Sequence, residues 1–265
     1  MNLSENHLEE LRQAMEILEN PGIVAKITNA IGQPLEKALE FLPKNVHEKI
    51  GTITEAALIK AADTAIFTMK DTPNTRPSNW WHKFGVAAFG AVGGFFGLPA
   101  LTIELPVSTT IMLRSVVDIA RSEGESIADP DVKLACLEVF ALGGKSESDN
   151  ASESGYFAAR IALAQTMAEA ARQFTTKTVA DEGASVIVKL ISKVAARFSV
   201  QVSEKVTAQA VPAIGAAGGA IVNTLFIDHF QAMAKGHFTV RRLEKIYGKE
   251  TIRTTYERNA EEVVC

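Results

Sequence analysis

The sequence is poor in cysteine, with only Cys136 and Cys265 among its 265 residues. Two cysteines cannot build the multi-bridge framework of a small secreted domain or a four-cysteine zinc site. Cys136 lies within an apolar run, which predicts a small buried core residue. His82 has no partner at metal-ligand spacing. We therefore predict neither a metal site nor a cofactor.

Aromatic residues and excess charge are also scarce. Aromatics make up 7% of the chain against 47% hydrophobic residues, so the core must consist mostly of Ala, Val, Ile and Leu, which suits closely packed helices. The net charge of −4 gives no general basis for nucleic-acid binding. The first fifteen residues are acidic and amphipathic, whereas a signal peptide begins basic and turns apolar. We expect a cytoplasmic chain.

No catalytic motif stands out from the sequence. The run Gly143-Gly144-Lys145-Ser146 resembles the end of a phosphate-binding loop, but the glycine that begins such a loop, five residues before the Gly-Lys pair, is absent here. The pair Asp228-His229 is adjacent in sequence, and neighbours on a helix point apart. We interpret that pair as the end of a helix returning to solvent. Whether the protein is an enzyme is left open by these residues.

The chain is organised around Phe84–Ile103, a stretch without a charged side chain. On a helix, its phenylalanines fall on one side and its glycines within an arc of about 100° on the other. Glycine costs about 1 kcal/mol inside a helix relative to alanine, and close helix–helix approach would explain four on one face. The glycines are Gly90, Gly93, Gly94 and Gly97.

The length of this stretch leaves its relation to a membrane open. From Phe84 to Leu98 a helix rises about 22 Å, short of a hydrocarbon core of roughly 30 Å. Pro99 also interrupts the run. We favour a buried or reversibly inserted helix over a fixed span. Trp80 and Trp81, just before the stretch, are either an interfacial anchor or the packing of a loop.

A second uncharged stretch, Val206–Ile227, carries Gly215, Gly218 and Gly219 on one face. The simplest physical account is that the two small-residue faces pack on each other. The predicted fold is therefore all-α, a compact multi-helix bundle in which two glycine-rich apolar helical segments pack together. We expect a helical extension at 1–44, a main helical domain at 45–250 and a tail at 251–265.

Apolar spacing and helix punctuation predict the helices. The predicted segments are 3–18, 45–69, a helix from Pro106 to about Arg121, Pro130 to Leu142, 155–174 and 181–210. The last is expected to carry Lys189, Lys193, Arg197 and Lys205 along its polar edge.

Two polar groupings are candidate sites. Arg114 and Asp118 lie four residues apart and can pair on one helix face, and Glu104 lies just before that helix. We expect this cluster to be structural, or a polar group in an apolar pocket. The segment from Lys235 to Arg258 is locally basic, and could bind anionic headgroups or form an ordinary solvated helix. Its candidate basic surface consists of Arg241, Arg242, Lys245 and Lys249.

An ordered set of short motifs resembles the bacterial EcsC family over about Asn45 to Gly248. The matching segments are Gly97-Leu98-Pro99, Glu104-Leu105-Pro106, Thr109-Thr110, 112–115, Ile119-Ala120, Glu123-Gly124, 136–144, Gly155-Tyr156 with Arg160, Pro212, Gly215, Gly218-Gly219, Asn223, 228–230 and 237–244. The resemblance implies a helical, membrane-associated bacterial protein. The family supplies no catalytic residues to transfer.

Three functions fit these observations. The first is a cytoplasmic protein, peripheral to the inner membrane, that binds a membrane lipid or membrane protein. The second is a soluble helical hydrolase of lipid or peptide, with Glu104, Arg114 and Asp118 in an apolar pocket. The third is a soluble helical scaffold whose apolar segments are only core. We favour the first function.

Overall fold

A computed structural model describes residues 3–19, 26–29, 43–66, 98–143, 155–174, 184–210 and 215–264. Every regular element in these ranges is a helix, and they contain no strand. The predicted all-α class and packed bundle are therefore confirmed. Trp80, Trp81 and the first glycine cluster (Gly90, Gly93, Gly94 and Gly97) lie outside the described residues, so the packing of the two glycine faces stays a prediction.

The bounds of the helices follow the chain. They are α1 (Glu5–Glu19), α4 (Lys44–Ala61), the π-helical turn η1 (Ala62–Ile66), α6 (Leu98–Ser122), α7 (Pro130–Glu138), the 3-10 turn η2 (Val139–Ala141), α8 (Gly155–Phe174), α9 (Ala184–Ala210), α10 (Gly215–Tyr247) and α11 (Lys249–Val264). Among these described elements, no helix is both long and apolar enough to cross a membrane.

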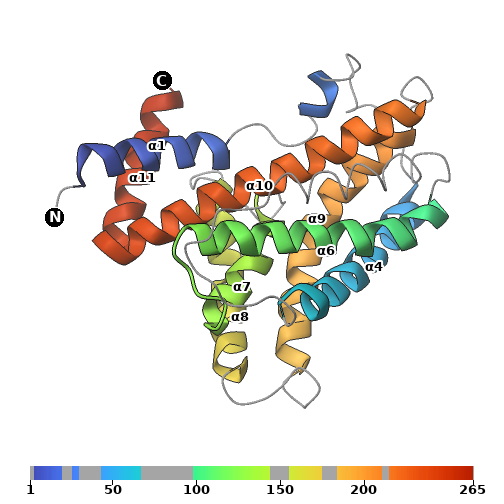
Figure 1. Cartoon of the computed structure of the whole chain (residues 1–265), viewed down its shortest axis with the longest axis horizontal. Coiled ribbons are helices and arrows are strands. Elements are labelled where there is room, and N and C mark those ends of the chain that lie inside the picture. The colour runs from blue at the N-terminus through green and yellow to red at the C-terminus, as the bar shows by residue number, and fades with distance from the viewer. Residues whose placement is uncertain are drawn as a thin grey trace.

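The helix α10 is the axis of the bundle. It runs along the long dimension of the molecule and contacts α1, α6, α9 and α11 (Figure 1). The helices α1 and α11 lie at one end, and α4 packs on α6 and α9 at the other. Phe198 on α9, Phe140 in η2 and Phe226 and Phe230 on α10 form a buried aromatic cluster, with ring centroids 4.9–5.9 Å apart. This cluster fixes α9 and η2 against α10.

The predicted helices at both α1 and α7 are confirmed. The buried face of α1 carries Leu11, Met15 and Leu18 at the helical spacing read from the sequence. The α7 helix begins at Pro130, directly after Asp129, whose carboxylate accepts the backbone N–H of Asp131. Such a cap satisfies an N–H group that has no partner within the helix.

The predicted start of α6 is wrong. The helix begins at Leu98 and continues through Pro106, so Glu104 lies inside it rather than before it. A proline inside a helix removes one backbone hydrogen bond and crowds the preceding turn. Hydroxyl groups bond to backbone carbonyls around this point, Ser108 Oγ to Leu105 O at 3.2 Å and Thr110 Oγ1 to Pro106 O at 2.7 Å. Burial of this helix in the bundle outweighs the cost of the proline.

Two further predictions are corrected by burial. Asp228 and His229 lie in the middle of α10, and the His229 side chain is buried rather than returned to solvent. Apolar residues continue past this pair, so packing extends the helix beyond it. Lys205, predicted on the polar edge of α9, is fully buried because it pairs with Glu104 of α6, and Arg197 is buried as well.

Candidate ligand-binding site

A cavity of about 660 Å³ lies between α7, α8, α10 and α11, within the usual size range of a small-molecule site. One wall is apolar and comes from α8. The other walls are charged. The lining residues are Asp129, Asp131 and Glu138, then Phe157, Arg160, Ile161, Ala164, Met167 and Ala168 of α8, then Arg241, Glu244, Lys245, Lys249, Glu250 and Arg253.

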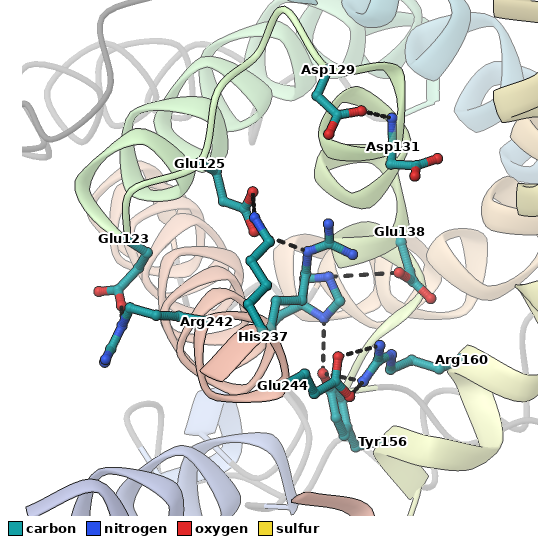
Figure 2. A network of polar contacts seen from close by, with 12 residues as sticks. Glu123, Glu125, Asp129, Asp131, Glu138, Tyr156, Arg160, His237, Arg242 and Glu244 are labelled. Atoms are coloured by element: carbon teal, nitrogen blue, oxygen red, sulfur yellow. Dashed lines mark hydrogen bonds and ion pairs between the residues drawn. The ribbon is translucent and has the colours of Figure 1, made fainter. Parts of the chain in front are cut away.

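The most buried charged residue that lines the cavity is Glu138, at the end of α7. It is buried, and its Oε2 lies 3.6 Å from Nε2 of His237 on α10 (Figure 2). Burial raises the pKa of Glu138 above its ordinary value, although the nearby Arg160 and Arg241 oppose the shift. A buried carboxyl with a perturbed pKa in a cavity is a candidate functional group.

Tyr156 holds His237 in one orientation through the ring nitrogen that does not face Glu138. The Tyr156 hydroxyl lies 3.0 Å from His237 Nδ1 and accepts a hydrogen bond from Arg160 at 3.2 Å. Because the guanidinium can only donate, the tyrosine proton is available to Nδ1. We therefore assign the imidazole proton to Nε2, the atom that faces Glu138. Burial lowers the pKa of His237 well below its ordinary value, so the ring is neutral.

Arg160 is fixed by a bidentate ion pair. Its two terminal nitrogens donate to Glu244 at 2.7 and 3.0 Å, and its guanidinium carbon lies 5.3 Å from the centre of the Tyr156 ring. Paired N–H donors on a carboxylate give both strength and geometric definition. The cavity thus has a rigid inner surface, drawn from α7, α8 and α10.

Most of the predicted basic surface is paired with acidic residues. Arg241 and Lys245 bind Glu125 at 3.4 and 2.5 Å. Arg242 binds Glu123 at 2.9 Å and Glu10 of α1 at 2.7 Å. These acidic partners offset much of the positive charge on this face of α10.

Lys249, the remaining member of the predicted basic surface, is exposed at the start of α11. It has no ion-pair partner within the described ranges. Together with Arg241 and Lys245 it lines the cavity. Three of the four predicted basic residues therefore come together at this site.

The predicted cluster of Glu104, Arg114 and Asp118 lies elsewhere. None of the three lines the cavity. Glu104 forms a buried ion pair with Lys205, Nζ to Oε1 2.5 Å, and Asp118 pairs with Arg121. Gly215, Gly218 and Gly219 lie in the first turns of α10.

The inner residues of the cavity were not predicted as a site. Helical spacing carried part of the signal, since Tyr156 and Arg160 are four residues apart and His237, Arg241 and Glu244 recur after four and three. Such spacing places each set on one helix face. Apart from Arg241, which belongs to the predicted basic surface, these residues were noted only as parts of motifs shared with a family.

The fold and the site define a class, an all-helical protein with a half-apolar cavity over a buried network of charged and polar side chains. A model of the EcsC protein family matches residues 5–243. The chain therefore belongs to the EcsC family. The match begins within α1, well before Asn45, where we expected the resemblance to begin. No curated protein and no solved structure matches the chain.

Proposed function

We propose that this EcsC protein associates with the cytoplasmic membrane by binding an anionic phospholipid in the cavity between α7, α8, α10 and α11. The observation that carries the proposal is the division of the cavity into one apolar wall and several charged ones. A phospholipid has the same division, with an acyl chain at one end and a charged headgroup at the other.

The apolar wall suits an acyl chain. Phe157, Ile161 and Met167 come from three different turns of α8 and line the cavity. Ile161 is 47% exposed, although it is a large aliphatic residue. Covering such a side chain with an acyl chain removes apolar area from water, which stabilises a complex by about 25 cal/mol per Å².

The cationic residues suit a phosphate group. Arg241 and Lys245 come from α10, and Lys249 and Arg253 from α11. The side chain of Lys245 is 59% exposed in spite of its pairing with Glu125. Lysine and arginine near a membrane surface contribute around 1 kcal/mol each to the binding of anionic lipid.

The carboxylates of the cavity favour a particular headgroup. Asp129 and Asp131 lie at the start of α7, away from Arg160 and Tyr156 (Figure 2). They would repel a second anionic group and can accept hydrogen bonds from hydroxyls. A phosphodiester with a glycerol headgroup therefore fits better than a lipid with several phosphates.

The test is flotation of purified protein with vesicles of phosphatidylglycerol or phosphatidylcholine, at low and high salt. We expect flotation with phosphatidylglycerol alone. Lys249→Glu should weaken it by roughly thirtyfold, since reversing one charge changes the binding free energy by about 2 kcal/mol. Lys189→Glu is the matched control, because Lys189 is exposed on α9 and does not line the cavity.

Each other outcome has a definite meaning. The absence of flotation with either lipid would overturn the proposal, and equal losses in the two variants would replace a defined site with general charge attraction. Flotation that resists salt and survives Lys249→Glu would assign binding to the apolar stretch 84–103 and to Trp80 and Trp81 instead.

A further inference from the structure

We propose that Glu138 binds the headgroup as a carboxylic acid, donating its proton to a phosphate oxygen, so that lipid binding is linked to the binding of one proton. This inference rests on the proposed function and names how the same site is regulated. Of the two buried carboxyl groups that line the cavity, Glu244 is paired with Arg160, and the inference concerns the other, Glu138.

The position of Glu138 leaves its carboxyl available to a ligand. The residue lines the cavity, and its side chain is only 5% exposed. Within the described part of the chain it makes no hydrogen bond, and the one basic side chain within 4 Å of its carboxyl oxygens is His237, with Nε2 at 3.6 Å. Buried polar groups are normally hydrogen-bonded, so this carboxyl lacks a partner that a ligand can supply.

The protonation state of Glu138 in the complex follows from the charge and hydrogen bonding of a phosphodiester. Its non-ester oxygens carry the negative charge and accept hydrogen bonds, so a carboxylate beside them would be repelled. A protonated carboxyl has an O–H donor and removes that repulsion. The ligand would therefore select the acid form of Glu138.

The groups that face Glu138 come from three helices. Tyr156 and Arg160 lie on α8, His237, Arg241 and Glu244 on α10, and Lys249 on α11. Each of these helices provides a cation that favours the carboxylate when no anion is bound: Arg160, Arg241 and Lys249. A bound anion draws on the field of all three. Anion binding thus raises the affinity of Glu138 for its proton, and by reciprocity protonation of Glu138 raises the affinity for the anion.

Glu138→Gln tests the role of the titratable proton apart from the shape and hydrogen bonding of the side chain. The amide keeps the shape, donates to phosphate through its N–H groups and accepts from His237 through its oxygen, yet it does not titrate. Glu48→Gln is the matched control, because Glu48 is exposed on α4 and does not line the cavity. Circular dichroism would establish that both variants are folded.

The experiment measures the affinity for water-soluble dihexanoyl phosphatidylglycerol, as monomers, from about pH 5 to about pH 9. This phosphodiester stays singly charged over the whole range, and His237 stays neutral. Wild-type affinity should fall with rising pH, by up to about tenfold per pH unit above the pKa of Glu138. Glu48→Gln should follow the wild type, and Glu138→Gln should bind with little pH dependence.

The outcomes distinguish this inference from the proposed function. No binding by wild type at any pH would remove the proposed function itself. Binding by Glu138→Gln with the wild-type pH profile, or its loss at every pH, would overturn the proton linkage and leave lipid binding in place. If Glu138→Gln does not fold, calorimetry of the wild type in two buffers of different ionisation enthalpy decides. Uptake of a proton near neutral pH supports the linkage, and no uptake overturns it.

Discussion

The carboxyl group of Glu204 on α9 keeps its proton to a higher pH than an ordinary glutamate does. Burial raises the pKa of Glu204 from an ordinary 4.5 to about 7. The folded state then holds a proton that the unfolded chain has already lost. The stability contributed by this group is complete below the unfolded pKa and is lost as pH rises through the folded one.

We therefore expect the free energy of unfolding to fall between about pH 4.5 and about pH 7, and Glu204→Gln to remove that part of the fall. At pH 8 the variant should be more stable than the wild type by about 1–3 kcal/mol, allowing for partial exposure of the group. Urea unfolding at several pH values checks this. Glu48→Gln, at an exposed carboxyl on α4, should leave the wild-type curve unchanged. Parallel curves for wild type and Glu204→Gln would contradict the prediction.

At the scale of elements, a close approach of α1 and α10 depends on Gly236. A Cβ atom at this position would lie 2.8 Å from Leu18 Cγ and 3.2 Å from the Ala14 carbonyl oxygen of α1. Contacts this short force one helix to shift. The glycine thus lets α1 lie directly on the α10 backbone.

Gly236→Ala should destabilise the protein by about 1–2 kcal/mol, even though alanine favours a helix by about 1 kcal/mol. Thermal unfolding measures the change, and amide exchange in α1 should rise. Gly51→Ala is the control, because a Cβ atom there meets no atom within 4 Å, and it should stabilise α4 by up to about 1 kcal/mol. If both variants stabilise the protein, the close contact is not a constraint.

The helices could be predicted where their signals are local. Apolar spacing in α1 and the Asp129-Pro130 start of α7 act within a few residues, and both helices form where expected. Predictions failed where packing outweighed local signals, at Pro106 inside α6 and at Asp228-His229 inside α10. A proline or a polar pair does not end a helix when the residues before and after it are both buried in the bundle.

The site could not be predicted as a site because its parts are far apart in the chain. His237 is 81 residues from Tyr156, and Arg160 is 84 from Glu244. Spacing within α8 or α10 shows which side chains share a face, but not which face meets α7. The ion pairs of Glu123 and Glu125 could not be predicted for the same reason, since the basic residues that they bind are more than a hundred positions away.

Across the whole molecule, one buried ion pair joins elements from the middle and later parts of the chain. Lys205 of α9 is fully buried, its Nζ lies 2.5 Å from Glu104 of α6, and Asn223 of α10 donates to the same carboxylate at 3.4 Å. The lysine also lies 5.0 Å from the centre of the Phe226 ring. Three central helices therefore depend on this pair.

Lys205→Met should destabilise the protein by about 3–5 kcal/mol, because it leaves a buried carboxylate without its cation. Adding Glu104→Gln should recover a large part of the loss, since the charge left without a partner is then gone. Chemical denaturation of both single variants and the double variant measures the coupling. Additive effects would show that the two residues do not stabilise the fold as a pair.

The position of α1 sets the order in which the molecule can be completed. Its Glu10 binds Arg242, which is 232 residues later, and its Glu19 accepts from the Tyr256 hydroxyl, 237 residues later. During synthesis α1 therefore leaves the ribosome long before the surface that buries Leu11, Met15 and Leu18 exists. Contacts of such high sequence separation slow folding and leave apolar surface open to aggregation. Although α1 is synthesised early, it is among the last helices to be buried, and the nascent chain exposes its apolar face to chaperones until α10 and α11 emerge.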